Sequence, residues 1–168
     1  MPGRIACRQP GTEWVEEVLE RIGLRPCALT VEVTESALMD DISVIRSAFN
    51  RLRSQGVRVA IDDFGTGYSS LSRLQQLPVD VIKLDRAFVT GVDVRAEARG
   101  MAAAILQLSA AIGAAVVAEG IETEAEAATL LDLGYTHGQG YLLGRPMPIE
   151  DLTARLRAQT DYAVRELQ

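Results

Sequence analysis

Hydrophobic residues recur along the chain with two alternating spacings, one near every second residue and one near every third or fourth residue. Short runs rich in Val, Ile and Leu predict β-strands at residues 29–34, 57–61, 79–84 and 114–118. Residues 135–143 predict a fifth strand or extended segment. Stretches with helical spacing lie between these predicted strands.

The stretches between the strands have the apolar spacing of amphipathic helices and the residues that commonly begin and end helices. Predicted helices cover residues 14–22, 42–52, 71–77, 95–112, 123–134 and a polar segment from 149 onward. Thr12 is the expected N-cap of the first, and Thr123 with Glu126 fits a capping box. In the helix over 95–112 we expect four residues to face the core: Met101, Ile105, Leu108 and Ile112.

This alternation of strands and helices predicts an α/β fold with a parallel sheet and right-handed crossovers. Two closures satisfy the pattern, a doubly wound sheet or a barrel of the (β/α)₈ type. A full barrel needs roughly 200 residues or more, and this chain has 168. We therefore expect a single domain with a partial TIM-like barrel.

Composition and charge narrow the class of partner. The chain has 17 basic and 23 acidic residues and a net charge of −6, which argues against binding a nucleic-acid polymer or an anionic membrane. The longest apolar runs are too short for a membrane-spanning segment, and the first ten residues lack the apolar core of a secretory signal. Two cysteines are too few for a disulfide framework, and we expect a cytoplasmic protein.

Acidic and polar residues recur where each predicted strand ends. In chain order they are Glu32, Glu35, Asp62, Asp63, Lys83, Asp85, Glu119, Glu122 and Gln139. The carboxyl ends of parallel strands meet at one edge of the sheet, where ligands of such folds bind. Converging carboxylates repel one another unless cations neutralise them, and oxygen ligands suit Mg²⁺ or Mn²⁺. Two such ions, bridged by Asp62 and Asp63, would suit phosphodiester cleavage, with Lys83 orienting or deprotonating the water or balancing charge.

Taken singly, these residues have other interpretations. Glu32 would fit a solvent-facing position of a strand, Asp62 and Asp63 would fit a turn and helix cap, and Lys83 would fit a strand-end lysine. Glu119 and Glu122 would fit the region that caps the next helix, and Gln139 a loop hydrogen bond. Their joint placement at one predicted edge favours a site. The glycine-rich run over 62–70 further suggests a loop that moves with ligand or dimer state.

Several of these residues lie in distinctive strings: EVTES at 32–36, DDFGTGYSS at 62–70, KLD at 83–85, AEGIET at 118–123 and QGY at 139–141. In this order they resemble the EAL-domain family of cyclic di-GMP phosphodiesterases, and the resemblance runs from about Leu29 to Leu152. It implies a TIM-like barrel that uses Mg²⁺ or Mn²⁺ to open cyclic di-GMP to linear pGpG.

The resemblance also implies roles for individual residues. Glu32, Asp62 and Asp63 would be metal ligands, Lys83 would hold the attacking water, and Glu119 would be a metal ligand or general base. The others would act around them: Glu35 as the anchor of the loop over 62–70, and three residues near metals, waters or substrate, namely Asp85, Glu122 and Gln139.

Two family motifs are absent or altered. No Glu-Ala-Leu tripeptide occurs in the chain, although its Glu is a metal ligand in the family. The family's strand-end Asn corresponds loosely to Arg4, whose side chain only donates hydrogen bonds and cannot ligate a metal. We therefore expect the C-terminal two thirds of the domain, its fourth to eighth strands: residues 1–27 as a weakly matching lead-in, 28–152 as the core and 153–168 as a terminal helix and tail.

Two functions remain open on these grounds. The first is a metal-dependent phosphodiesterase that hydrolyses cyclic di-GMP to pGpG. The second is a catalytically inactive, truncated or degenerate module that binds cyclic di-GMP or a protein partner. A metal enzyme of another (β/α) family is a weaker third, because no phosphate-binding glycine loop lies near the last strands. An incomplete barrel leaves parallel edges open, so we also expect self-association or completion by another chain or an upstream segment.

Overall fold

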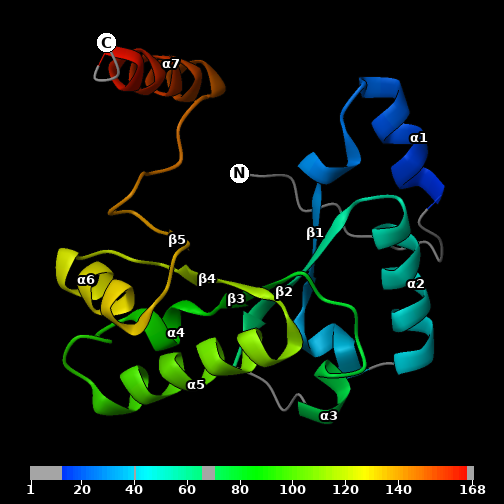
Figure 1. Ribbon diagram of the computed structural model, residues 1–168, viewed down its shortest axis with the longest axis horizontal. Coiled ribbons are helices and arrows are strands. Elements are labelled where there is room, and N and C mark those ends of the chain that lie inside the picture. The colour runs from blue at the N-terminus through cyan, green and yellow to red at the C-terminus, as the bar shows by residue number, and fades with distance from the viewer. Residues whose placement is uncertain (1–12, 40, 66–70, 166–168) are drawn as a thin grey trace.

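Five parallel strands form one sheet in the computed structural model, which describes residues 13–39, 41–65 and 71–165. The strands lie side by side in chain order (Figure 1): β1 (Thr30–Thr34), β2 (Arg58–Phe64), β3 (Val81–Leu84), β4 (Ala115–Glu119) and β5 (Gly138–Gln139). A doubly wound sheet reverses its strand order at a switch point, whereas a barrel adds each strand next to the last. The order confirms the expected partial barrel.

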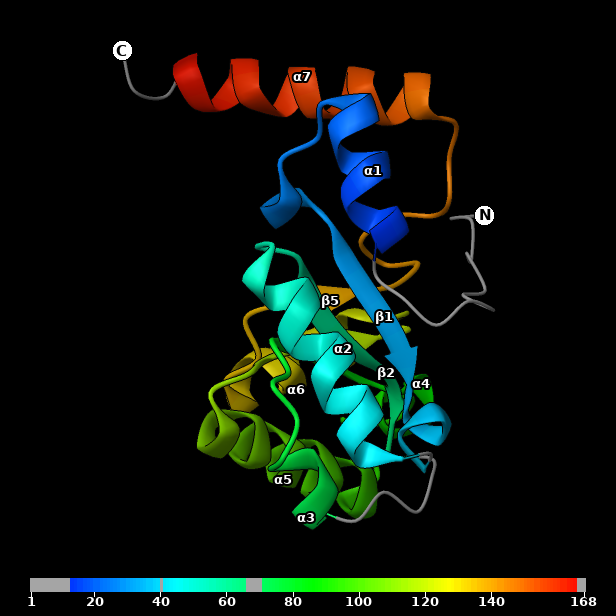
Figure 2. The same ribbon diagram turned by 90° about the vertical axis from the view of Figure 1, so that its right-hand side faces the viewer.

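Helices lie before, between and after the strands (Figures 1 and 2). They are α1 (Glu13–Ile22), α2 (Ile42–Ser54), α3 (Leu71–Leu74), α4 (Arg86–Val89), α5 (Ala96–Ile112), α6 (Glu124–Leu133) and α7 (Ile149–Arg165), with 3₁₀ turns at Pro26–Ala28 and Glu35–Met39. The pattern missed α4 and both 3₁₀ turns, which are too short to show a period. The Thr123–Glu126 capping box is confirmed, whereas Thr12 and Arg4 lie outside the described residues.

The core consists of aliphatic side chains from the strands and from the inner faces of the helices. Val59, Ile61, Ile82 and Leu84 are fully buried in the two central strands, and Phe49 of α2 packs onto the same cluster. Burial of such side chains stabilises by about 1.5–3 kcal/mol each. This core holds the strands in register, and the strand ends in turn fix where the polar side chains stand.

The prediction that Met101 faces the core is wrong, because its side chain is 41% exposed. The buried face of α5 instead passes through Ala98, Ala102, Ile105 and Ser109. Small residues on that face let the helix lie close to the sheet, and Met101 falls on the outer side. Ile22 at the end of α1 is also exposed.

Strand β2 is longer than expected and contains an irregularity at its carboxyl end. Asp62 and Asp63, predicted to follow the strand, lie within it. Ile61 is paired with Ile82 and Phe64 with Leu84, so two residues of β2 face the single residue Lys83 of β3. Asp63 has a φ of 55°, in the left-handed region that Asp tolerates better than most residues.

The chain after β5 leaves the sheet. Figures 1 and 2 show α7 standing apart from the strands at the end of an extended connection. Ile149, Leu152 and Leu156 of this helix are exposed, while Arg155 donates to the carbonyl of Leu143 in the connection at 3.3 Å. Among the described residues, none of the helices combines the length and apolar character needed to cross a membrane.

Candidate metal centre

Four neighbouring strands bring an acidic or basic side chain to the carboxyl edge of the sheet. They are Glu32 of β1, Asp62 of β2, Lys83 of β3 and Glu119 of β4. Alternate residues of a strand point to the same face, so the apolar neighbours Ile61, Ile82 and Ala118 turn to the core while these side chains turn to the other face. The geometry brings together residues that are up to 87 positions apart in the chain, from 32 to 119.

Lys83 stands at the centre of the cluster. Its Nζ lies 3.0 Å from Glu32 Oε2, 2.9 Å from Asp62 Oδ1 and 2.6 Å from Glu119 Oε1. The Lys83 side chain is only 11% exposed, and those of Asp62 and Glu119 are 13% and 15% exposed. An ammonium group has three N–H donors, so one carboxylate from each of three strands satisfies them.

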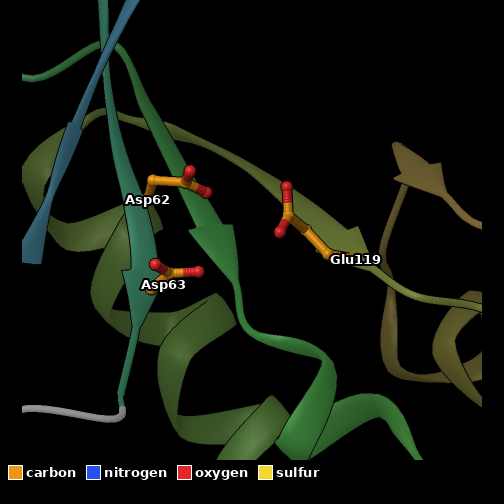
Figure 3. Close-up of side chains that lie close together, drawn as sticks. All are labelled: Asp62, Asp63 and Glu119. Atoms are coloured by element: carbon orange, nitrogen blue, oxygen red, sulfur yellow. The ribbon is translucent and has the colours of Figure 1, made fainter. Parts of the chain in front are cut away.

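Asp63 adds a fourth carboxyl group. Figure 3 shows Asp62 and Asp63 on β2 and Glu119 on β4, with the carboxyl groups turned toward the space between the two strands. One oxygen from each of these three residues lies within 4.8 Å of the others. Consecutive strand residues normally point to opposite faces. The irregularity in β2 removes that alternation and lets two adjacent aspartates share one side.

The partial burial of the cluster changes how its groups titrate. Burial raises the pKa of the Glu119 carboxyl, repulsion from Asp62 and Glu32 raises it further, and the contact with Lys83 offsets part of that rise. Burial alone lowers the pKa of Lys83, but its hydrogen bonds to Glu119, Asp62 and Glu32 outweigh this effect, so that its pKa lies above the ordinary range. Lys83 therefore carries a fixed positive charge among the carboxylates.

Gln139 adds another contact to the Glu119 carboxylate. Its Nε2 donates to Glu119 Oε1 at 2.6 Å, the same oxygen that contacts Lys83. The strand that carries Gln139 is held by Gly140, where the backbone of Ile121 passes so close that a Cβ atom would overlap it. Ile121 donates to the carbonyl of Gln139 at 3.1 Å. Glycine at position 140 is thus needed for Gln139 to reach Glu119.

The remaining predicted site residues, Glu35, Asp85 and Glu122, make other contacts. Glu35 is buried, and its Oε2 accepts from the N–H of Gly65 at 2.9 Å, which ties the turn after β1 to the end of β2. Asp85 caps α4 by accepting from the N–H of Ala87 at 2.8 Å. Glu122 is exposed and pairs with Arg86 at 3.0 Å. Residues 66–70 of the predicted mobile loop lie outside the described residues.

An open cleft of about 870 Å³ adjoins the cluster. Its lining includes Glu119 and Gln139 together with three arginines, Arg86, Arg145 and Arg155. The Arg145 guanidinium lies over the Tyr141 ring at 4.6 Å from the ring centre. A lining that combines acidic residues, arginines and an aromatic ring suits a ligand that has both phosphate groups and flat rings.

The donor set fits divalent cations that prefer oxygen. Four carboxyl groups, from Glu32, Asp62, Asp63 and Glu119, face one ammonium group. Such a surplus of partly buried negative charge is unfavourable by itself, and oxygen-only ligands match Mg²⁺ or Mn²⁺ better than zinc.

Sequence reasoning missed three contributors to the site. Phe88 of α4 packs against Gly65 at the end of β2, and Arg86 lies over Gly120 next to Glu119. Glu126 was recognised only as part of a capping box, although its carboxylate also accepts from the N–H of Gly91. The segment after the KLD motif has no hydrophobic period that would reveal these contacts, because α4 has only four residues.

Comparison with known proteins agrees with this geometry. The EAL domain family matches residues 6–146. The cyclic di-GMP phosphodiesterase NbdA of Pseudomonas aeruginosa is 45% identical over 146 residues, which is 86% of this chain and 18% of that protein. The chain spans about a fifth of the length of the curated relatives it matches.

Two solved structures show the same arrangement of strands. The EAL domain of Mycobacterium smegmatis DcpA superposes with a TM-score of 0.83 at 40% identity, covering 87% of this chain and 66% of that one. Klebsiella pneumoniae BlrP1, solved as a complex with manganese and cyclic di-GMP, gives a TM-score of 0.75 at 36% identity, covering 80% of this chain and 34% of that one. The chain described here belongs to the EAL domain family.

Proposed function

We propose that this chain forms the metal-binding part of a phosphodiesterase that hydrolyses cyclic di-GMP to linear pGpG. The observation that carries the proposal is the meeting of Glu32, Asp62, Asp63 and Glu119 around Lys83 at one edge of the sheet. Relatives named for cyclic di-GMP hydrolysis, and a related structure that holds manganese with cyclic di-GMP, support the choice of substrate.

The four carboxylates would hold the divalent ions, with Asp62 and Asp63 placed to serve neighbouring positions. When bound, Mg²⁺ or Mn²⁺ activates water and stabilises the leaving oxygen of a phosphodiester. Lys83 would keep the attacking water in line and balance the charge of the transition state. Hydrolysis forms a bond from the water oxygen to phosphorus and breaks one ester P–O bond, which opens the ring.

Residues outside the ligand set would orient the metal ligands and bind the rest of the substrate. Gln139 donates to Glu119 and so sets the direction of its free lone pairs. The cleft beyond Glu119 would take the rest of the dinucleotide, since its guanidinium groups and the Tyr141 ring match phosphates and bases. Glu35, through Gly65, would anchor the loop that leaves β2.

A second candidate is a module that binds cyclic di-GMP or a protein without hydrolysing the nucleotide. The specific observation in its favour is the absence of a Glu-Ala-Leu tripeptide, whose Glu would be one further metal ligand. Fewer ligands weaken a metal site, because affinity follows the number and charge of the ligands.

The decisive experiment incubates the purified chain with cyclic di-GMP and Mn²⁺ and separates the products by chromatography. The proposal expects pGpG, and it expects Glu119→Gln to abolish its formation while Glu20→Gln, an exposed control on α1, leaves it unchanged. Turnover that persists in Glu119→Gln points to a contaminating enzyme. Binding of cyclic di-GMP without any pGpG favours the second candidate, and the absence of both binding and turnover contradicts the two together.

Among the described residues, the sheet ends at β1 on one side and at β5 on the other. Parallel edge strands present unpaired N–H and C=O groups to other chains, and the matched DcpA domain extends beyond the part that this chain covers. We expect a polypeptide that supplies further βα units to pair with these edges. A monodisperse monomer with cooperative unfolding would contradict this expectation.

A further inference from the structure

The segments that follow Lys83 and Glu119 in the chain lie side by side. One follows Lys83 and passes through Asp85 and α4 to Gly91. The other follows Glu119 and passes through Gly120 to the start of α6. Ile121 of the second segment donates to the carbonyl of Gln139 in β5, but the ladder between β3 and β4 ends before both segments and does not fix their relative positions. Other contacts must hold them together.

Glu126, in the first turn of α6, joins these two segments. Its Oε1 accepts from the N–H of Gly91 at 2.9 Å, and its Oε2 accepts from the N–H groups of Glu122 at 3.0 Å and Thr123 at 3.1 Å. The residue is only 5% exposed. A capping box needs the contact to Thr123 alone. The contacts to Gly91 and Glu122 therefore exceed what ending the helix requires.

Buried side chains and a helix cap hold the segment that contains Gly91. Val89 and Val92 flank Gly91 and are fully buried, and Asp85 fixes the start of α4 through its contact with Ala87. Glu126 thus accepts hydrogen bonds from Gly91, in the segment that follows β3, and from Glu122, three residues after Glu119 in the segment that follows β4. A movement of either segment would break hydrogen bonds to a buried carboxylate, which is costly.

A second tie joins the same segments nearer the surface. The stem of Arg86 lies against Gly120, with no room for a Cβ atom, and its guanidinium pairs with Glu122 at 3.0 Å. Both side chains are largely exposed, so this pair holds weakly. The buried Glu126 is the stronger of the two ties.

We propose that Glu126 is a positioning residue for the metal centre, which fixes the segment after Glu119 relative to the segment after Lys83 through its hydrogen bonds to Gly91 and Glu122. This inference rests on the proposed function, because it concerns the same site. Glu126 touches neither the cation nor the substrate. It acts through the backbone, and its loss lets the Glu119 carboxylate leave its place among the other ligands.

The test compares Glu126→Gln with Thr123→Val by calorimetric titration with Mn²⁺ and by thermal unfolding. Thr123→Val removes the hydroxyl that accepts from the N–H of Glu126 and leaves the contacts to Gly91 and Glu122. Both variants should unfold a few degrees lower. Because outer ligand-orienting contacts typically change metal affinity by 10–100-fold, we expect Mn²⁺ affinity to fall about tenfold in Glu126→Gln and less than about twofold in Thr123→Val. Equal losses in both variants, or no loss in Glu126→Gln, overturn the proposal.

A measurement on the unmodified chain covers the case in which Glu126→Gln does not fold. Coupling is reciprocal, so saturating Mg²⁺ should slow hydrogen exchange at the amides of Gly91, Glu122 and Thr123 more than in α2. Equal protection in both regions overturns the proposal. An unmodified chain that binds no cation contradicts the proposed function, whereas one that binds normally and shows no effect of Glu126 contradicts this inference alone.

Discussion

The two ends of the same sheet treat carboxylates in different ways. At the amino ends of the strands, Asp80 accepts from the N–H of Val59 at 2.9 Å and pairs with Arg53 at 3.0 Å. One acid there meets one cation. At the carboxyl ends, Lys83 contacts three acids, Glu32, Asp62 and Glu119, and Asp63 lies beside two of them. The first arrangement is complete by itself, whereas the second has surplus negative charge.

This difference separates a structural ion pair from a candidate site. An ion pair of one acid and one half-exposed arginine contributes little to stability and needs no further cation. A partly buried cluster with more acids than bases costs stability unless cations join it. Counting charges within each cluster is therefore more informative than noting that acidic residues lie near one another.

The largest expected effect comes from removing each cation in turn. In the absence of metal, Lys83→Met should lower the free energy of unfolding by about 3 kcal/mol or more, because partly buried carboxylates lose their partner. Arg53→Met at the other end should cost at most about 1 kcal/mol. Urea unfolding with and without Mg²⁺ measures both. Saturating Mg²⁺ should recover part of the loss in Lys83→Met and none in Arg53→Met, and equal losses that ignore the metal would break the comparison.

Asp63→Asn tests whether the surplus acids bind a cation. Asn tolerates the left-handed backbone conformation of this position, so the fold should persist while one charge disappears. We expect Mn²⁺ affinity to fall by roughly 100-fold, since even outer contacts change it by 10–100-fold. Calorimetric titration is the measurement, with Asp93→Asn as an exposed control. Unchanged affinity in Asp63→Asn would remove Asp63 from the ligand set.

Gln139→Ala tests the orienting contact on Glu119. The side chain donates to Glu119 Oε1, and its loss should weaken Mn²⁺ binding by about tenfold, a smaller effect than losing a ligand. Gln107→Ala on the exposed face of α5 is the matched control. A loss as large as that of Asp63→Asn would mean that Gln139 has a more direct part.

The smallest expected effect concerns Glu126. Like Asp80, this carboxylate already has its hydrogen-bond partners within the protein. Burial raises its pKa, but hydrogen bonds from Gly91, Glu122 and Thr123 outweigh this and lower the pKa below the ordinary value of a glutamate. A carboxyl whose pKa is lower in the folded state stabilises above its unfolded pKa, and this contribution is lost as the pH falls. The stability difference between the parent and Glu126→Gln should be constant from about pH 6 to 8 and shrink as the pH falls through the range in which carboxyl groups take up protons. A difference that grows on acidification would contradict this account.

The strands and the gathering of acids at one edge could be predicted from the sequence. Runs such as 57–61 and 79–84 are rich in Val, Ile and Leu and follow a glycine or a proline, and parallel strands necessarily bring their carboxyl ends together. The order of the strands in the sheet then confirmed the partial barrel. The roles assigned to single residues stay predictions.

The parts that could not be predicted depend on tertiary contacts. The extra residue in β2 that turns Asp62 and Asp63 to one side is invisible to a period of two. Met101 lies outside because the alanines of α5, with little hydrophobic surface, pack closest to the sheet. The contact between Glu126 and Gly91 joins residues 35 positions apart, which no local pattern records.

The most direct test of the account is an anomalous diffraction map of crystals of this chain soaked in Mn²⁺. The account predicts a peak within about 2.0–2.2 Å of oxygens from Asp62, Asp63 and Glu119, since small hard cations bind at such distances. Carboxylates that point apart, or manganese that binds only elsewhere on the surface, would contradict it.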